Sequence, residues 1–183
     1  DLSHRRGSAG GFYRFPAQDT QNVPEFYPDG FLPLIRPTMD DQSITIGIRR
    51  KGDWNVDASL THGASAFRFD IDNTVNASLG TASPTTFDAG TLSSSQTVAN
   101  LDLLHKLDTD AVKSLALVLG SELRVENYQI TAGDQASYEL GTATTAGGQP
   151  KLPGAQVFPG FQPSNEVDRT RDNIGIYAGL ESE

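Results

Sequence analysis

The chain has 183 residues and a mass of 19.6 kDa, which allows one domain with a sizeable core but not several. Its net charge of −9 and only 14 Lys plus Arg provide no basic stripe for phosphates, so we expect no nucleic-acid partner. The absence of cysteine excludes disulfides, thiolate metal sites and cysteine nucleophiles, and no apolar run approaches the roughly 18 residues of a membrane-spanning helix.

Residues 1–40 are predicted to form a long loop. They are rich in glycine, proline and aromatic residues, and prolines at this density are incompatible with a helix or a central strand. We therefore expect an ordered or semi-ordered segment ahead of the first strand.

The first two strands are predicted on either side of a turn at 50–53, where Gly52 can adopt a positive φ. Apolar residues occupy every second position in 44–48 and again in 54–60, which is the two-faced pattern of a strand. The apolar positions then change parity at 67–71. A bulge near Gly63 is the predicted cause.

The clearest strand signal lies between Leu115 and Val125. One side of this stretch is apolar except at Ser121, and the other side becomes polar toward Glu122, Arg124 and Glu126. A two-faced strand of this length exceeds the roughly five or six residues usual in soluble sheets, and it matches the roughly 9 to 11 that a tilted strand needs to cross a bilayer. The pattern predicts membrane-spanning strands.

Connections of very different length separate the predicted strands. Long loops are expected at about 1–40, 76–96 and 132–171, and short turns at 50–53 and 108–114. In an up-and-down antiparallel sheet, alternate connections lie at the same end, so the long loops gather on one side, as in outer-membrane barrels.

The predicted fold is therefore all-β. About five antiparallel up-and-down strands, the third and last at 99–107 and 174–180, form a partial, open section of a large transmembrane β-barrel with long extracellular loops.

The polar side of these strands carries charged and amide residues. A charge facing lipid near the bilayer centre costs roughly 2–4 kcal/mol, whereas one facing a wet lumen costs little. Five residues are accordingly predicted to face the lumen: Asp57, Asn100, Asp102, Glu122 and Arg124. Trp54 follows the first short turn and fits either an interfacial aromatic belt or an ordinary packed core.

Short segments in a fixed order extend from about Tyr27 to the end of the chain. They are 27–33 (YPDGFLP), 76–80 (NASLG), 83–90 (SPTTFDAG), 100–102 (NLD), 120–128 (GSELRVENY) and 156–161 (QVFPGF). As an ordered set, they resemble the barrel portion of TonB-dependent outer-membrane receptors.

That resemblance implies a bacterial outer-membrane location and a barrel of roughly 22 strands around a separate plug. Such receptors take up a scarce ligand, such as an iron chelate, cobalamin or an oligosaccharide, with energy supplied by TonB. The implied partners are outer-membrane lipid, TonB through the plug, and that ligand.

The chain departs from the family pattern, because it shows no plug, no TonB-contacting segment and no terminal assembly strand. It begins with Asp1 and ends inside an alternating pattern, so we read residues 1–183 as an interior piece of the barrel. Five strands cannot close a barrel that needs about eight. Uptake is therefore expected of a longer protein rather than of this piece alone.

Candidate chemistry is sparse. His4, His62 and His105 lack metal-ligand spacing, and the serines at 93–95 lack a nucleophile elbow, so we expect no enzyme activity, catalytic residue, metal or cofactor. Ligand contact is the remaining role. It is assigned to the loop aromatics Tyr27, Phe31, Phe158 and Phe161, for which packing of the loops is the simpler alternative.

Two other classes of protein fit parts of the pattern. One is a secreted or periplasmic β-sandwich that binds carbohydrate, in which two apolar stripes face one another. The other is a β-rich hydrolase, which lacks a recognisable nucleophile and base. Whether Leu101, Leu117 and Ile176 contact a second sheet or face outward separates the barrel section from the sandwich.

Overall fold

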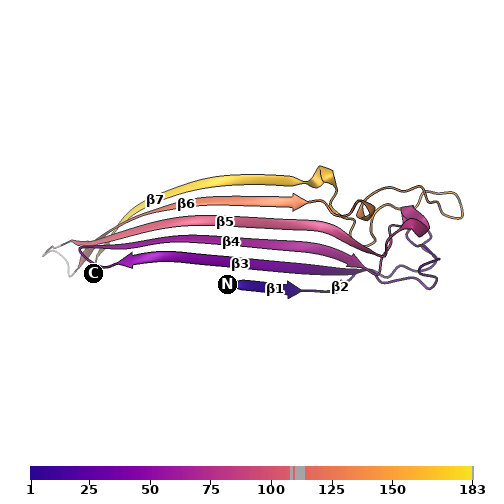
Figure 1. The fold of residues 1–183 in the computed structure, drawn as a ribbon, viewed down its shortest axis with the longest axis horizontal. Coiled ribbons are helices and arrows are strands. Elements are labelled where there is room, and N and C mark those ends of the chain that lie inside the picture. The colour runs from indigo at the N-terminus through magenta and orange to yellow at the C-terminus, as the bar shows by residue number, and fades with distance from the viewer. Residues whose placement is uncertain (108, 110–113, 183) are drawn as a thin grey trace.

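The computed structural model describes residues 1–107, 109 and 114–182, and it shows a single open antiparallel sheet of seven strands (Figure 1). The strands are β1 (Leu2–Arg6), β2 (Ala9–Gly10), β3 (Leu34–Arg50), β4 (Trp54–Asp72), β5 (Thr86–Leu107), β6 (Leu115–Thr131) and β7 (Val167–Ser182). Short 3-10 turns lie at Ala77–Ala82, Gln135–Ser137 and Pro163–Asn165. The all-β, antiparallel prediction is confirmed.

The sheet order is β1-β3-β4-β5-β6-β7, with β2 also paired to β3. From β3 onward each strand pairs with the next one in the chain, which is the predicted up-and-down order. Figure 1 shows a long, bowed band whose segments 11–33, 73–85 and 132–166 gather at one end, here called the loop end. The opposite end, the turn end, holds the β3–β4 turn, whereas the predicted link 108–114 lies mostly outside the described residues.

The prediction of one loop over residues 1–40 is wrong in part. β1 and β2 pair with β3, which itself begins at Leu34. β1 has no apolar alternation and is held by backbone pairing and by ion pairs such as Arg5–Asp41. The Pro37 carbonyl accepts a hydrogen bond from Gly7 N–H (2.9 Å), and Gly7 lies in the gap between β1 and β2. Proline is tolerated at this position of β3 because the sheet needs no backbone N–H donor at that gap.

The predicted loops at 76–96 and 132–171 are also too long. β5 begins at Thr86 and β7 at Val167, so strands occupy the ends of both segments. Residues 93–96 of β5 are serines and a glutamine, paired with β4 on one side and β6 on the other. Here both faces of the sheet are polar, so the alternation that marks a strand in the sequence disappears.

The predicted bulge near Gly63 is wrong. β4 pairs without interruption through Gly63, and the irregularity lies instead between Arg68 and Asp70. Opposite it, β5 contains Gly90 with φ of +101°, a conformation suited to glycine. The apolar residues at 67–71 therefore lie on the other face of β4 from those at 54–60, because the surroundings of the strand change near the loop end. The register of β4 does not shift at Gly63.

The register sorts the side chains onto two faces. On one, the apolar face, β6 places Leu115, Leu117, Leu119, Leu123 and Val125, followed by polar Asn127, Gln129 and Thr131. Each of these leucines pairs with at least one apolar residue of β5 or β7, whereas Val125 pairs with Thr97 and Asp172. The apolar belt is the part of this face formed by 44–48, 54–62, 97–107, 115–125 and 174–180. Ten residue steps of about 3.4 Å, tilted by about 40°, correspond to a height of about 25 Å.

No second layer covers the apolar belt within the described chain, whose strands all lie in one sheet. Ile176 is 84% exposed, Ile46 62%, Leu123 53% and Leu101 39%, and Leu117 is half-buried against its neighbours in the sheet. The described helical turns are too short to cross a bilayer. The belt is therefore a continuous apolar surface without a protein partner in this structure.

The buried core lies mainly at the loop end. Val23, Phe31 and Val75 form its apolar cluster, and Ile71 and Phe87 are fully buried where β4 and β5 reach the loops. We call the segments 11–33, 73–85 and 132–166 the loop layer. This layer packs on the end of the sheet and gives it an interior that the middle of the sheet lacks.

Asn76 connects two parts of the loop layer. Its side chain is fully buried, accepts from Ser78 N (3.2 Å) and Ser78 Oγ (2.7 Å), and donates to the carbonyls of Ala136 (2.9 Å) and Glu139 (2.8 Å). All the hydrogen-bonding capacity of this amide is used, so 73–85 is tied to 132–166.

Replacing Asn76 with alanine is expected to destabilise the loop layer by about 1–3 kcal/mol, because the partly buried carbonyls of Ala136 and Glu139 lose the hydrogen bonds that its side chain donates. Amide hydrogen exchange of residues 135–143 measures this loosening. The control is Asn55→Ala, which removes a single 3.3 Å contact at the turn end. Unchanged exchange in Asn76→Ala would show that these bonds do not hold the layer.

Candidate functional site

The face opposite the apolar belt, here called the polar face, carries all five residues that the sequence assigns to a wet surface. Asp57 pairs with Asp102, and Asn100 pairs with Glu122, so these four share one face. Arg124 lies on the same face two residues further along β6. The register thus places the five together, on the side away from the belt.

Most charges on the polar face are balanced by a neighbour. Four ion pairs link adjacent or nearby positions: Arg49–Asp57 (2.5 Å), Arg124–Glu122 (2.8 Å), Arg171–Glu126 (2.6 Å) and Arg5–Asp41 (2.5 Å). The Tyr177 hydroxyl donates to Asp102, and its ring lies over Gly120. Exposed ion pairs of this kind contribute little to stability, because water screens the attraction between the two charges. A surface built from them is therefore compatible with contact with water.

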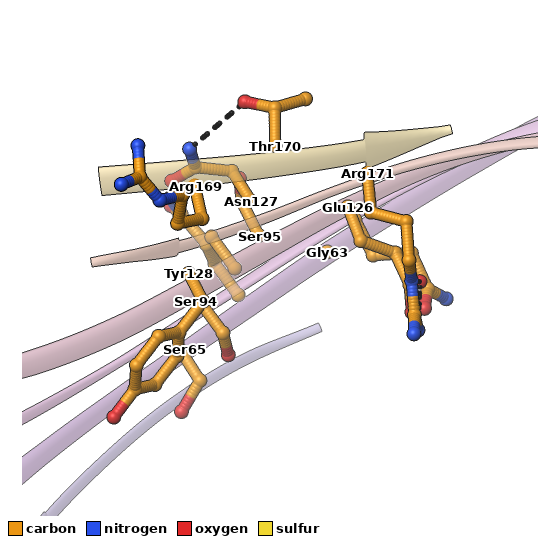
Figure 2. A pocket seen from close by; sticks show the side chains of 13 residues that line it. Gly63, Ser65, Ser94, Ser95, Glu126, Asn127, Tyr128, Arg169, Thr170 and Arg171 are labelled. Atoms are coloured by element: carbon orange, nitrogen blue, oxygen red, sulfur yellow. Dashed lines mark hydrogen bonds and ion pairs between the residues drawn. The ribbon is translucent and has the colours of Figure 1, made fainter. Parts of the chain in front are cut away.

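A hollow of about 660 Å³ lies over the sheet between the belt and the loop layer (Figure 2). Its polar-face residues come from two successive rows of paired positions and include Gly63, Ser65, Ser94, Glu126 and Tyr128. In Figure 2, the Glu126–Arg171 pair and the Asn127–Thr170 hydrogen bond lie on opposite sides of the strands. The hollow is therefore lined mainly by residues of polar type, with small residues between larger charged and aromatic ones.

Tyr27 and Phe31, predicted to contact a ligand, pack together in the loop layer with ring centroids 4.6 Å apart. Phe31 is only 3% exposed and belongs to the apolar cluster with Val23 and Val75. Burial raises the pKa of Tyr27 above its ordinary value, which fits a phenol partly removed from water. In this structure, Phe31 has little surface to offer a ligand.

Phe158 and Phe161, the other predicted ligand residues, lie in a second aromatic cluster. Phe69 of β4 contacts both rings, at centroid distances of 5.0 Å and 6.0 Å, and Phe67 lies 4.7 Å from Phe69. All four rings are half-buried. The cluster joins the polar face to the loop layer, and the structure keeps it apart from the Tyr27–Phe31 pair.

Sequence reasoning missed several residues of this surface. Phe67 and Phe69 belong to the apolar positions of 67–71, and the register places them on the polar face near the loop end. Arg169 and Arg171 lie within the predicted loop 132–171, but the structure places them on β7. The alternate positions 175, 177 and 179 extend backwards by three steps of two residues to 173, 171 and 169, and this pattern is the signal that identifies both arginines.

Asp19 links two segments of the loop layer. Its carboxylate accepts from Ala146 N–H (3.0 Å) and lies 3.3 Å from the Lys151 ammonium, which also donates to the Asn22 carbonyl (2.7 Å). The hydrogen bond from Ala146, with help from Lys151, lowers the pKa of Asp19 below its ordinary value of 3.8.

Because the folded pKa of Asp19 is lowered, its tie to Ala146 stabilises the loop layer above pH 3.8 and is lost as the pH falls through the folded pKa. We expect the amide resonance of Ala146 to titrate with a midpoint below 3.8 in an NMR experiment from pH 6 downward. Asp19→Asn is expected to abolish this titration. A midpoint above 3.8 would contradict the assigned hydrogen bond.

Within the described part of the chain, no group of three or more His, Cys, Asp or Glu is arranged to hold a metal ion. Comparison with known proteins adds no identification: no family model, no curated protein and no solved structure matches this chain.

Proposed function

We propose that this sheet is a section of a transmembrane β-barrel in the bacterial outer membrane, part of an active transporter of the TonB-dependent kind. Its apolar belt contacts lipid, and its polar face lines the passage of a scarce ligand whose uptake is driven through TonB. The observation that supports this proposal most strongly is that no protein layer covers the apolar belt, while the opposite face carries paired charges.

The dimensions of the belt support a membrane location. At the strand tilt of about 40° typical of outer-membrane barrels, the ten residue steps of β6 in the belt correspond to their apolar band of about 25 Å. Polar side chains replace apolar ones at similar levels on adjacent strands: β7 is already polar at Asp172, which pairs with Val125, and β6 becomes polar at Asn127. The strands continue beyond the belt toward the loop layer, which suits segments that leave the hydrocarbon for water.

The edges of the sheet support a larger assembly. Among the described residues, β7 has no partner beyond β6, and residues 44–50 of β3 have no strand partner beyond β4. An open edge exposes unpaired backbone groups, which hydrocarbon does not tolerate. Further strands that close the barrel remove both edges.

The two ends of the sheet suit the two sides of an outer membrane. Outer-membrane barrels have short periplasmic turns and long extracellular loops, so the turn end is periplasmic in this proposal and the loop layer extracellular. At the turn end, Trp54 stacks on His105 with ring centroids 4.7 Å apart, on the apolar face. Aromatic rings at this level fit an interfacial belt.

A β-sandwich that binds carbohydrate is less well supported. Such a domain buries its apolar stripe against a second sheet about 10 Å away. The described residues form one sheet, and Ile174 and Ile176 on its apolar face are 75% and 84% exposed. The sandwich reading would need a second sheet supplied by another molecule.

Spin labels on single cysteines test the proposal in lipid vesicles, and the chain has no native cysteine to remove. We expect labels at Leu101, Leu123 and Ile176 to be accessible to oxygen, which concentrates in lipid. Labels at the adjacent positions Asn100, Glu122 and Gly175 are expected to be accessible to a water-soluble nickel complex instead. Labels at Leu101, Leu123 and Ile176 protected from both reagents, with the other set still accessible to nickel, would indicate a dry sandwich interior and contradict the proposal.

A charge on each face tests the same assignment energetically. Leu101→Arg is expected to destabilise the membrane-inserted state by about 2–4 kcal/mol, because it places a cation against lipid near the middle of the belt. Asn100→Arg, at the same depth on the polar face, is expected to change stability by less than about 1 kcal/mol. Urea unfolding from vesicles measures both, and equal effects would be evidence against a lipid-facing belt.

A further inference from the structure

We infer that the hollow over the polar face binds an acidic oligosaccharide, with Arg169 contacting a carboxylate of the sugar and Tyr128 contacting its ring. This inference rests on the proposed function and assigns a substrate class to the polar face. It depends on three features of the hollow: an unpaired cation, an exposed aromatic ring and unused space above small residues.

The first feature is Arg169. In the part of the chain that the structure describes, the other polar-face arginines are each paired with a carboxylate, namely Arg5, Arg49, Arg124 and Arg171. Arg169 lines the same hollow, has an exposed side chain and makes no such pair. Its planar guanidinium offers parallel donors that match a carboxylate.

The second feature is the row that contains Arg169. Tyr128 is its direct cross-strand partner, followed by Ser94 of β5 and Ser65 of β4 on the same face. The Tyr128 side chain is 45% exposed, so its ring can receive the apolar side of a sugar. Hydroxyl groups of Ser65 and Ser94 can donate or accept along the same line.

The third feature is the space above Gly63. A Cβ at this position would meet nothing nearer than the Gln42 carbonyl oxygen at 3.8 Å and the Ser43 Cβ at 4.0 Å. Gly63 therefore has no close contact that requires glycine, and it leaves the hollow open beside Gln96 and Glu126. An amide, a carboxylate and a bare backbone suit a ligand rich in hydroxyl groups.

Binding of trigalacturonate to the protein in detergent micelles, measured by calorimetry, tests the inference against neutral maltotriose. We expect trigalacturonate to bind at least roughly tenfold more tightly, with an affinity that falls as salt is added. Equal binding of the two sugars, or binding of ferric citrate without trigalacturonate, would overturn it.

Variants locate the site. Gly63→Val fills the hollow with a good strand former, and it is expected to weaken trigalacturonate binding by roughly tenfold or more without loss of folding. Gly175→Val is the matched control, because a Cβ there meets only Glu122 Cβ at 3.9 Å, outside the hollow. Unchanged binding in Gly63→Val would place the ligand elsewhere.

Arg169→Gln is expected to abolish the preference for the acidic sugar, and Arg169→Lys to retain part of it, because lysine keeps the charge but not the paired donors. A full preference in Arg169→Gln would overturn the role of this residue. Failure of the inference is distinguishable from failure of the proposed function, because a membrane-inserted sheet with two differently accessible faces and no sugar binding refutes the inference alone.

Discussion

The structure depends on the separation of apolar and polar side chains onto the two faces of one sheet. Each strand alternates, and the antiparallel register aligns the alternation of five consecutive strands, so the faces are continuous rather than patchy. A shift of one residue in any strand would place leucines among the ion pairs and charges among the leucines. The register is therefore defined by the same pattern that defines the two environments.

The buried core has an unusual position for an all-β chain, because it lies at the loop end instead of between two sheets. Asn76, Thr74 and Ser78 are fully buried there and bond to other segments of the loop layer. Three of the six segments that carry the resemblance, 27–33, 76–80 and 156–161, lie within this layer. Their glycines and amides are explained by its geometry, for example Gly30 at φ of +88°. The short sequence motifs in these segments therefore reflect how the loop layer packs.

The sequence predicted the strands of the apolar belt well, because alternation at 115–125 or 174–180 arises directly from contact with two different environments. It did not predict β1 or the start of β7 at Val167, because both faces are polar in these places and pairing with neighbours decides the conformation. It also missed the start of β5 at Thr86, where the alternation of buried Phe87 and Ala89 is broken at Gly90. The five residues assigned to the polar side were found from parity alone. Arg169 and Phe69 were not, since their roles depend on segments brought together by the fold.

The most direct measurement of the central claim uses the single tryptophan and lipids brominated at different depths. In the protein with Trp54→Phe and Leu101→Trp, bromines deep in the acyl chains are predicted to quench fluorescence most strongly, because position 101 lies near the middle of the belt. Native Trp54, at the turn end, is predicted to be quenched best by shallow bromines. If the fluorescence of the tryptophan introduced by Leu101→Trp is insensitive to bromine at every depth, the result would contradict a belt in contact with hydrocarbon.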